Sequence, residues 1–224
     1  MPVTAAAAVL AAAQAVTFAT KDGWTIAASY RPASQGAATI ILAHGVGSAS
    51  GEWARFAERL AASGVGTLAL DLRSHAGSRR GPSGSTDFTG FDAPDSWPAA
   101  AEDLRAAAAW LKSKGVSNTR IAFGGASIGA NLASIVAAER KSAPFLLLLS
   151  PAQNYRGVSL KTRRGLKTFA AASPGDGYSF ISVKGLEADK AASVLYAPGG
   201  HGVQMFEDPA TFERIVAETV QAAR

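Results

Sequence analysis

The first residue able to do chemistry is Ser127, which lies in the stretch GASIG at 125–129. This stretch fits G-x-S-x-G, follows an apolar run that predicts a strand, and opens a run that predicts a helix. A serine on so tight a turn needs small neighbours, and Gly125 and Gly129 meet that need. The same residues would also suit plain packing of a strand against a helix, but the strand–turn–helix context favours a nucleophile.

A serine hydroxyl needs a base, and the base needs an orienting acid. His201 lies in the stretch GGHG just after the last predicted strand, whereas the other two histidines precede the serine. Asp176 follows the strand before that, in a turn rich in glycine where an aspartate is also an ordinary turn residue. The rival acids Glu187 and Asp189 fall on the next predicted helix. The order serine, acid, histidine favours Ser127, Asp176 and His201 as a catalytic triad.

An acyl-transfer site also needs donors for the oxygen anion of its tetrahedral intermediate. One predicted donor is the backbone N–H of Ile128, the residue after the nucleophile. The second is the backbone N–H of Val46, in the turn His44-Gly45-Val46-Gly47 after a buried strand. We expect His44 to hold this turn in place and not to act as a second base.

Strands and helices must alternate to bring these residues together. The strand predictions are 15–20, 24–32, 38–45, 65–72, 119–126, 144–151, 166–173 and 192–199. The helix predictions are 52–64, 96–115, 127–141, 179–190 and 208–224. Asp22-Gly23 joins the first two strands as a hairpin, and the remainder alternates. This order predicts an α/β fold with about eight strands, mainly parallel, and helices on both faces. Ligands bind such sheets beyond the carboxyl ends of the strands.

Composition excludes several other kinds of site. The chain has 224 residues and no cysteine, so disulfides, thiolate catalysis and cysteine-ligated metals are excluded. Its three histidines are far apart in sequence, so we expect no metal and no cofactor. The net charge of +5 is scattered instead of forming a basic stripe, so we expect no nucleic-acid partner.

The beginning of the chain is ambiguous. Residues 1–15 are rich in alanine and end near an A-x-A-like site, but no lysine or arginine precedes the apolar run. They fit a trimmed signal or a short helix, and the run is too short to span a bilayer. We therefore expect a single domain at 16–224, without a transmembrane segment, in a bacterial-type soluble protein that is cytoplasmic or, with a trimmed signal, periplasmic or secreted.

Together these stretches resemble the α/β-hydrolase superfamily over nearly the whole chain. Residues 41–78 look like its oxyanion turn, first helix and D-x-R-x-H-x-x-S segment, and 125–129 look like its nucleophile elbow. Residues 173–180 look like its acid turn and 199–202 like its histidine loop. The resemblance implies the same triad and oxyanion donors as above, and a hydrolase fold.

Within that superfamily the chain is similar to small esterases of the dienelactone-hydrolase-like and serine-peptidase-related branch. Only residues 151–165 replace the helical lid of many relatives, so the cap is minimal or absent. Dienelactone hydrolases proper use a cysteine, which this chain lacks. The expected activity is hydrolysis of small carboxylic esters; a peptidase, a thioesterase and an idle binding protein are the alternatives. Candidates for the pocket wall are aromatic: Trp53, Phe88, Phe91, Trp97 and Tyr178.

Overall fold

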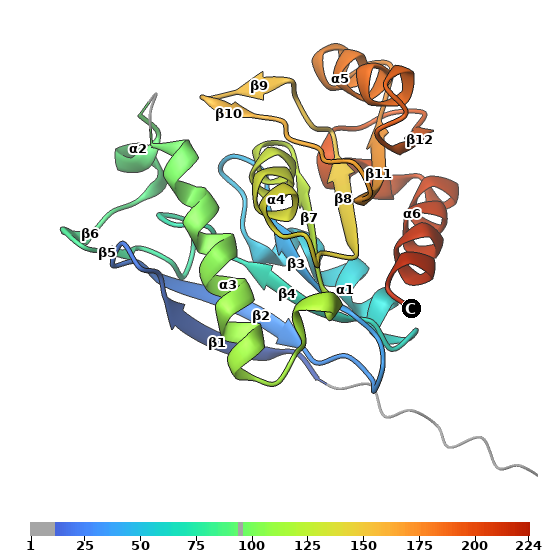
Figure 1. The fold of residues 1–224 in the computed structure, drawn as a ribbon. Coiled ribbons are helices and arrows are strands. Elements are labelled where there is room, and N and C mark those ends of the chain that lie inside the picture. The colour runs from blue at the N-terminus through green and yellow to red at the C-terminus, as the bar shows by residue number, and fades with distance from the viewer. Residues whose placement is uncertain (1–11, 94–95) are drawn as a thin grey trace, which may run out of the picture.

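The computed structural model describes residues 12–93 and 96–224, and an eight-stranded sheet runs through its centre (Figure 1). Its strands in chain order are β1 (Gln14–Ala19), β2 (Thr25–Arg31), β3 (Thr39–Ala43), β4 (Gly66–Leu70), β7 (Ile121–Ala126), β8 (Phe145–Leu149), β11 (Lys167–Ala172) and β12 (Ser193–Tyr196). In space the order is β1-β2-β4-β3-β7-β8-β11-β12. This sheet confirms the predicted α/β fold with eight strands.

Neighbouring strands run antiparallel only at the edge of the sheet that contains β1 and β2. β1 pairs antiparallel with β2, and β2 pairs antiparallel with β4. Every later pair, from β4 across to β12, is parallel. The central strands β3, β4, β7 and β8 are buried along their whole length. Strands covered on both faces need apolar residues at every position, which is why these segments read as continuous apolar runs.

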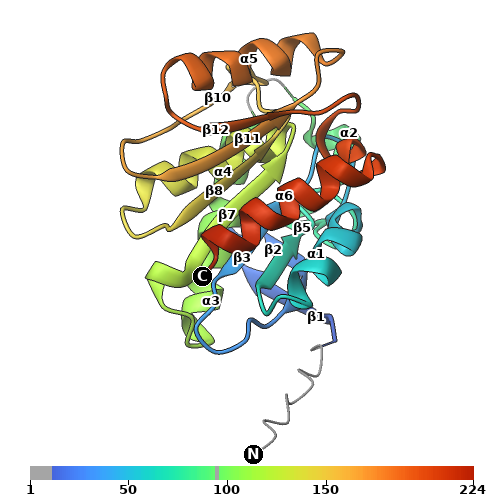
Figure 2. The ribbon, with the colours of Figure 1, turned by 90° about the vertical axis from the view of Figure 1, so that its right-hand side faces the viewer.

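Helices cover both faces of the sheet (Figures 1 and 2). One face carries α1 (Ala54–Ala61) and α6 (Pro209–Ala222), and the other carries α3 (Ala101–Ser113), α4 (Ile128–Glu139) and α5 (Gly177–Ala188). Each layer has its own apolar cluster against the sheet. Asp208 caps α6 by accepting a hydrogen bond from the Thr211 N–H at 2.8 Å, as the Asp-Pro start of that helix predicts.

The connections carry several short elements. These are η1 (Ser50–Trp53), β5 (Arg80–Gly81), β6 (Gly84–Ser85), α2 (Phe88–Phe91), η2 (Trp97–Ala100), η3 (Asn118–Arg120), β9 (Asn154–Tyr155), β10 (Val158–Ser159) and η4 (Gly202–Glu207). Between β8 and β11, the place of the lid in many relatives, the chain forms only the β9–β10 hairpin (Figure 1). The predicted minimal cap is therefore a two-stranded hairpin.

The predicted N-terminal extension falls mostly on residues 1–11, outside the described residues. β1 begins at Gln14, so the last two residues of that extension belong to the sheet. No helix in the described part of the chain is long and apolar enough to cross a membrane.

A buried arginine fixes the segment that follows β4. Arg73 donates to Asp103 on α3 from Nε at 2.9 Å and from Nη2 at 2.7 Å. It also donates to Asp22 in the β1–β2 turn at 2.7 Å. Asp103 has no exposed surface, so its charge depends on this paired arginine for compensation. The segment after β4 is thus tied to both α3 and the sheet edge.

Candidate active site

Ser127 occupies a sharp turn between β7 and α4. Its backbone has φ 55° and ψ −125°, a strained conformation for a residue with a side chain. The flanking glycines allow the turn: a Cβ on Gly125 would lie 2.2 Å from the carbonyl carbon of Gly129, and one on Gly129 would lie 2.3 Å from the Ala43 oxygen. Backbone and helix would collide with any larger residue, so both glycines of the motif are sterically required.

Asp176 and His201 come from neighbouring loops and meet. Asp176 follows β11 at the start of α5, and His201 follows β12. His201 Nδ1 lies 2.7 Å from Asp176 Oδ2. The Ser173 hydroxyl donates to the Gly200 carbonyl at 2.8 Å, which joins the two loops, and the Gln204 side chain accepts from the His201 N–H at 3.1 Å. The histidine is therefore held from its backbone and from its ring.

Two hollows share Ser127 and His201. We call the first, about 160 Å³, the small lobe; it is lined by Ser127, Ser150, Ala152, Tyr155, Asp176, Tyr178, Ser179 and His201. We call the second, about 480 Å³, the polar lobe; it is lined by Gly45, Val46, Ser48, Glu52, Ala126, Ser127, Tyr155, His201, Gly202, Val203 and Gln204. The structure thus brings the three predicted triad residues to the wall of one hollow.

The two predicted oxyanion donors lie beside the serine. Val46 lines the polar lobe, in the turn after β3. Ile128 is the first residue of α4, where backbone N–H groups have no acceptor within the helix. Its side chain is fully buried in the core, so only its backbone N–H is available for chemistry.

His44 fixes the turn that carries Val46, as predicted. The buried ring accepts from the Leu72 N–H through Nε2 at 3.0 Å and donates from Nδ1 to the Gly45 carbonyl at 2.6 Å. Burial lowers the pKa of His44 to about 4. It is therefore a neutral crosslink between the turn after β3 and the segment after β4.

His75 makes a second crosslink of the same kind. Its Nε2 accepts from the Gly47 N–H at 3.3 Å, and its Nδ1 donates to the Arg73 carbonyl at 2.9 Å. The two rings lie edge to face, with centroids 4.7 Å apart. Burial also lowers the pKa of His75. Two histidines upstream of the serine thus hold the loop that contains Val46.

The β9–β10 hairpin forms part of the wall. Tyr155 at its tip lines both lobes. The Tyr178 hydroxyl donates to the Asn154 carbonyl at 2.7 Å, so this predicted wall residue does line the small lobe and also joins α5 to the hairpin. On the opposite side, Arg156 forms an ion pair with Asp92. The hairpin is therefore attached to α5 through Tyr178 and to the segment after α2 through Asp92.

The other four predicted wall residues lie elsewhere. Trp53 and Trp97 have no exposed surface and pack in the apolar clusters on opposite faces of the sheet. Phe91 is 7% exposed and stacks edge-on against Trp97. Phe88 packs on the ring of His75, at 5.0 Å between centroids. Their apolar surface is used in the core, so the prediction that they form the wall is wrong.

Sequence reasoning missed several residues of the site, among them Ser150, Tyr155 and Glu52. Ser150 accepts from the Gly202 N–H at 2.9 Å, which anchors the loop after His201. Glu52, at the start of the first helical segment after β3, accepts from the Gly45 N–H at 3.3 Å. Burial raises the pKa of Glu52, against hydrogen bonds that lower it. A lone glutamate in an amphipathic helix start carries no signal that separates it from a surface residue.

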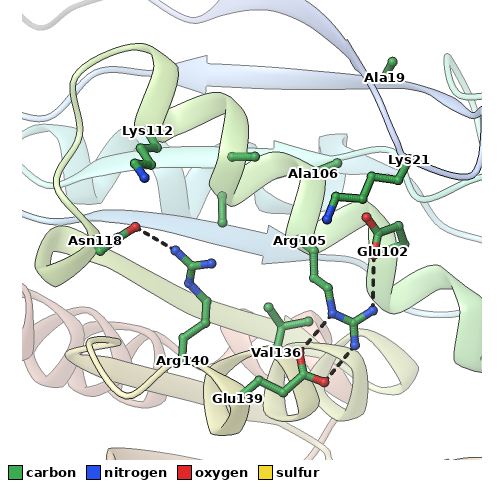
Figure 3. A pocket seen from close by; sticks show the side chains of 12 residues that line it. Ala19, Lys21, Glu102, Arg105, Ala106, Lys112, Asn118, Val136, Glu139 and Arg140 are labelled. Carbon is green, nitrogen blue, oxygen red and sulfur yellow. Dashed lines mark hydrogen bonds and ion pairs between the residues drawn. The ribbon is translucent and has the colours of Figure 1, made fainter.

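A hollow of about 490 Å³ far from this site lies between β1, α3 and α4 (Figure 3). Three of its charged side chains are paired with each other, since Arg105 bonds Glu139 at 2.8 Å and Glu102 at 3.4 Å. Arg140 donates to the Asn118 side chain at 2.8 Å. Among the described residues, its lining has no serine, threonine or histidine, so it has no counterpart of the Ser127 and His201 pair. The reactive groups are instead concentrated at the carboxyl ends of the strands, where α/β sheets bind ligands.

Known proteins share this fold. Alpha/beta hydrolase GrgF from Penicillium sp. superposes with a TM-score of 0.71 at 15% identity, over 95% of this chain and 99% of that one. An esterase of Pyrococcus furiosus gives 0.71 at 17% identity, over 94% and 91%. A dienelactone hydrolase of Anabaena variabilis gives 0.69 at 17% identity, over 95% and 97%. No curated protein matches the chain in sequence.

The family described as "Serine aminopeptidase, S33" matches residues 34–178. That span contains the turn of Val46, the serine elbow and Asp176, and it ends before His201. The fold, the strand order and the sequence of this protein thus lead to the same assignment. The chain is an α/β hydrolase and belongs to this serine aminopeptidase S33 family.

Proposed function

We propose that this hydrolase is a serine esterase that cleaves small carboxylic esters through an acyl-enzyme. Ser127 is the nucleophile, His201 the base and Asp176 the orienting acid. The backbone N–H groups of Val46 and Ile128 form the oxyanion hole. Esterases are among the proteins of the same fold, which agrees with the proposal.

One observation carries the proposal. Ser127, His201 and Asp176 line a single small hollow, and the histidine and the acid are 2.7 Å apart. An aspartate that accepts from Nδ1–H leaves Nε2 as the free acceptor of the imidazole. That tautomer is the one able to take a proton from a serine hydroxyl.

The steps follow from these positions. Ser127 Oγ attacks the acyl carbon while His201 Nε2 takes its proton, and Asp176 stabilises the resulting imidazolium. The oxygen anion accepts from the two backbone N–H groups. His201 then gives its proton to the leaving alcohol, and water repeats the sequence to release the acid and regenerate Ser127.

Hydrolysis of p-nitrophenyl acetate tests the assignment of the nucleophile. Ser127→Ala should lower kcat at least about 10³-fold, because only binding and the oxyanion hole remain. Ser113→Ala is the control: this exposed serine at the end of α3 donates to the Trp110 carbonyl within its own helix. Equal activity of Ser127→Ala and wild type would refute the assignment.

A panel of esters, amides and thioesters separates this proposal from its alternatives. The small lobe favours acetyl and butyryl esters over long acyl chains. Faster cleavage of aminoacyl p-nitroanilides than of any ester would indicate a peptidase instead. A protein whose Ser127 fails to react with a fluorophosphonate probe would be an idle member of the fold.

A further inference from the structure

Glu52 is a charged group in the polar lobe that the proposed mechanism does not use. It projects from η1 and is half-buried. Its carboxylate accepts from the Gly45 N–H at 3.3 Å and from the Ser48 side chain, and a positive charge on His201 would lower its pKa. The carboxylate therefore lies beside the oxyanion turn, within electrostatic reach of the base.

The charges around the two lobes do not balance. Among the described residues, neither lobe has a lysine or an arginine in its lining, although the protein carries a net charge of +5. The other carboxylate of the site, Asp176, is engaged with His201. A basic protein thus presents a negative polar lobe, and a partly desolvated carboxylate attracts a cation more strongly than one in water.

The two lobes suit different parts of an ester. With about 30 Å³ for each water-sized group, the small lobe holds roughly five such groups, which fits a short acyl chain. The leaving alcohol and the deacylating water take the same place, since His201 serves both. The polar lobe, with Glu52, Ser48 and Gln204, provides the hydrogen bonds that water needs. We therefore place the alcohol there.

Building on the esterase function proposed above, we propose that the polar lobe selects esters of positively charged alcohols, and that Glu52 is the residue that determines this selectivity. The cation of an amino alcohol compensates the carboxylate. It also offsets the repulsion that an unpaired carboxylate exerts on an oxygen anion at Val46 and Ile128. The substrate class is therefore short acyl esters of amino alcohols.

A pair of isosteric esters tests this selectivity. Acetylcholine and 3,3-dimethylbutyl acetate have nearly the same shape, and only the first is charged. Wild type should show a kcat/KM about tenfold higher for acetylcholine, with acid release followed by pH-stat. In Glu52→Gln the ratio of the two values should fall to about one. Any effect of this substitution on the Gly45 turn is common to both esters and cancels in the ratio.

Glu213→Gln is the matched control. Glu213 is an exposed residue on α6, paired with Arg59, and its substitution changes the net charge equally while leaving the ratio as in wild type. A wild-type ratio of one or less, or an unchanged ratio in Glu52→Gln, would overturn the inference. So would a preference for glycerol monoacetate over both esters, because neutral hydroxyls would then be the ligand of the lobe.

Inhibition of the wild-type enzyme gives a second measurement, which does not depend on whether Glu52→Gln folds. Choline should inhibit p-nitrophenyl acetate hydrolysis by wild type competitively, about tenfold more strongly than 3,3-dimethylbutanol does. Equal inhibition by the two alcohols would contradict the inference while leaving the esterase function intact. Failure of the esterase function would appear separately, as the absence of any hydrolysis that depends on Ser127.

Discussion

The three histidines of this protein lie in two contrasting surroundings. His44 and His75 are 0% and 3% exposed, and each ring joins the turn of the proposed oxyanion donor Val46 to the segment after β4. The side chain of His201 is 47% exposed, and its ring bonds one acid, Asp176. The same residue type thus provides fixed crosslinks in one region and the accessible, proposed base in the other.

The difference follows from what each region has to do. Oxyanion donors help most when they are already in place before charge develops, so the loop that carries them benefits from buried crosslinks. A base must hold a proton during turnover, and burial as deep as that of His44 makes the charged imidazole unfavourable. The next experiments disturb one region at a time.

The largest effect is expected from the exposed region. Asp176→Asn keeps the shape of the acid, but it removes the charge and permits the wrong tautomer of His201. We expect kcat for p-nitrophenyl acetate to fall by about 10³- to 10⁴-fold. Glu187→Gln is the control, because Glu187 accepts from the Tyr196 hydroxyl at 2.5 Å and lines neither lobe. A nearly normal rate in Asp176→Asn would transfer the orienting role to another carboxylate.

The buried region should show itself in the pH dependence of stability. The pKa of His44 is about 4 in the folded protein and 6.5 in its ordinary state. Between these values the unfolded chain binds a proton that the folded chain excludes, so stability falls as pH decreases. The loss amounts to about 2 kcal/mol between pH 8 and pH 5. Urea unfolding at both pH values measures it.

His44→Gln is the variant that isolates this contribution. Glutamine can accept from the Leu72 N–H and donate to the Gly45 carbonyl, but it does not titrate. Its free energy of unfolding should therefore decrease less between pH 8 and pH 5, by about 2 kcal/mol, with the other histidines unchanged. If the free energy of unfolding of His44→Gln decreased as much as that of wild type between the two pH values, His44 would have to take up its proton in the folded state.

Sequence patterns predicted the residues whose place depends on topology. Ser127, Asp176 and His201 each follow a strand, and parallel strands bring their carboxyl ends to one edge, so strand order alone places them near each other. The burial of Trp53 was also predictable. It has helical spacing to Phe56, and both belong to the same apolar cluster.

The remainder of the site depends on contacts between distant segments. Tyr155 lies on a strand of two residues, too short to have a periodicity, and it lines the same hollows as Ser127 because the hairpin forms part of their wall. Glu52 becomes distinctive only through its bond to the Gly45 N–H. Neither contact is encoded in local spacing, so a single sequence does not reveal them.

The smallest effect is expected where the two regions meet above the site. Arg156, beside Tyr155 on the hairpin, pairs with Asp92, which also accepts from the Trp97 indole N–H at 2.8 Å.

Ion pairs this accessible contribute little, so Asp92→Asn should raise KM about two- to fivefold and leave kcat unchanged. Increasing salt should raise the KM of wild type toward that of the variant. Glu139→Gln weakens the comparable pair of Arg105, which joins α3 to α4 away from the site, and should change neither constant. A fall in kcat for Asp92→Asn would mean that the hairpin positions Tyr155 for chemistry as well as for binding.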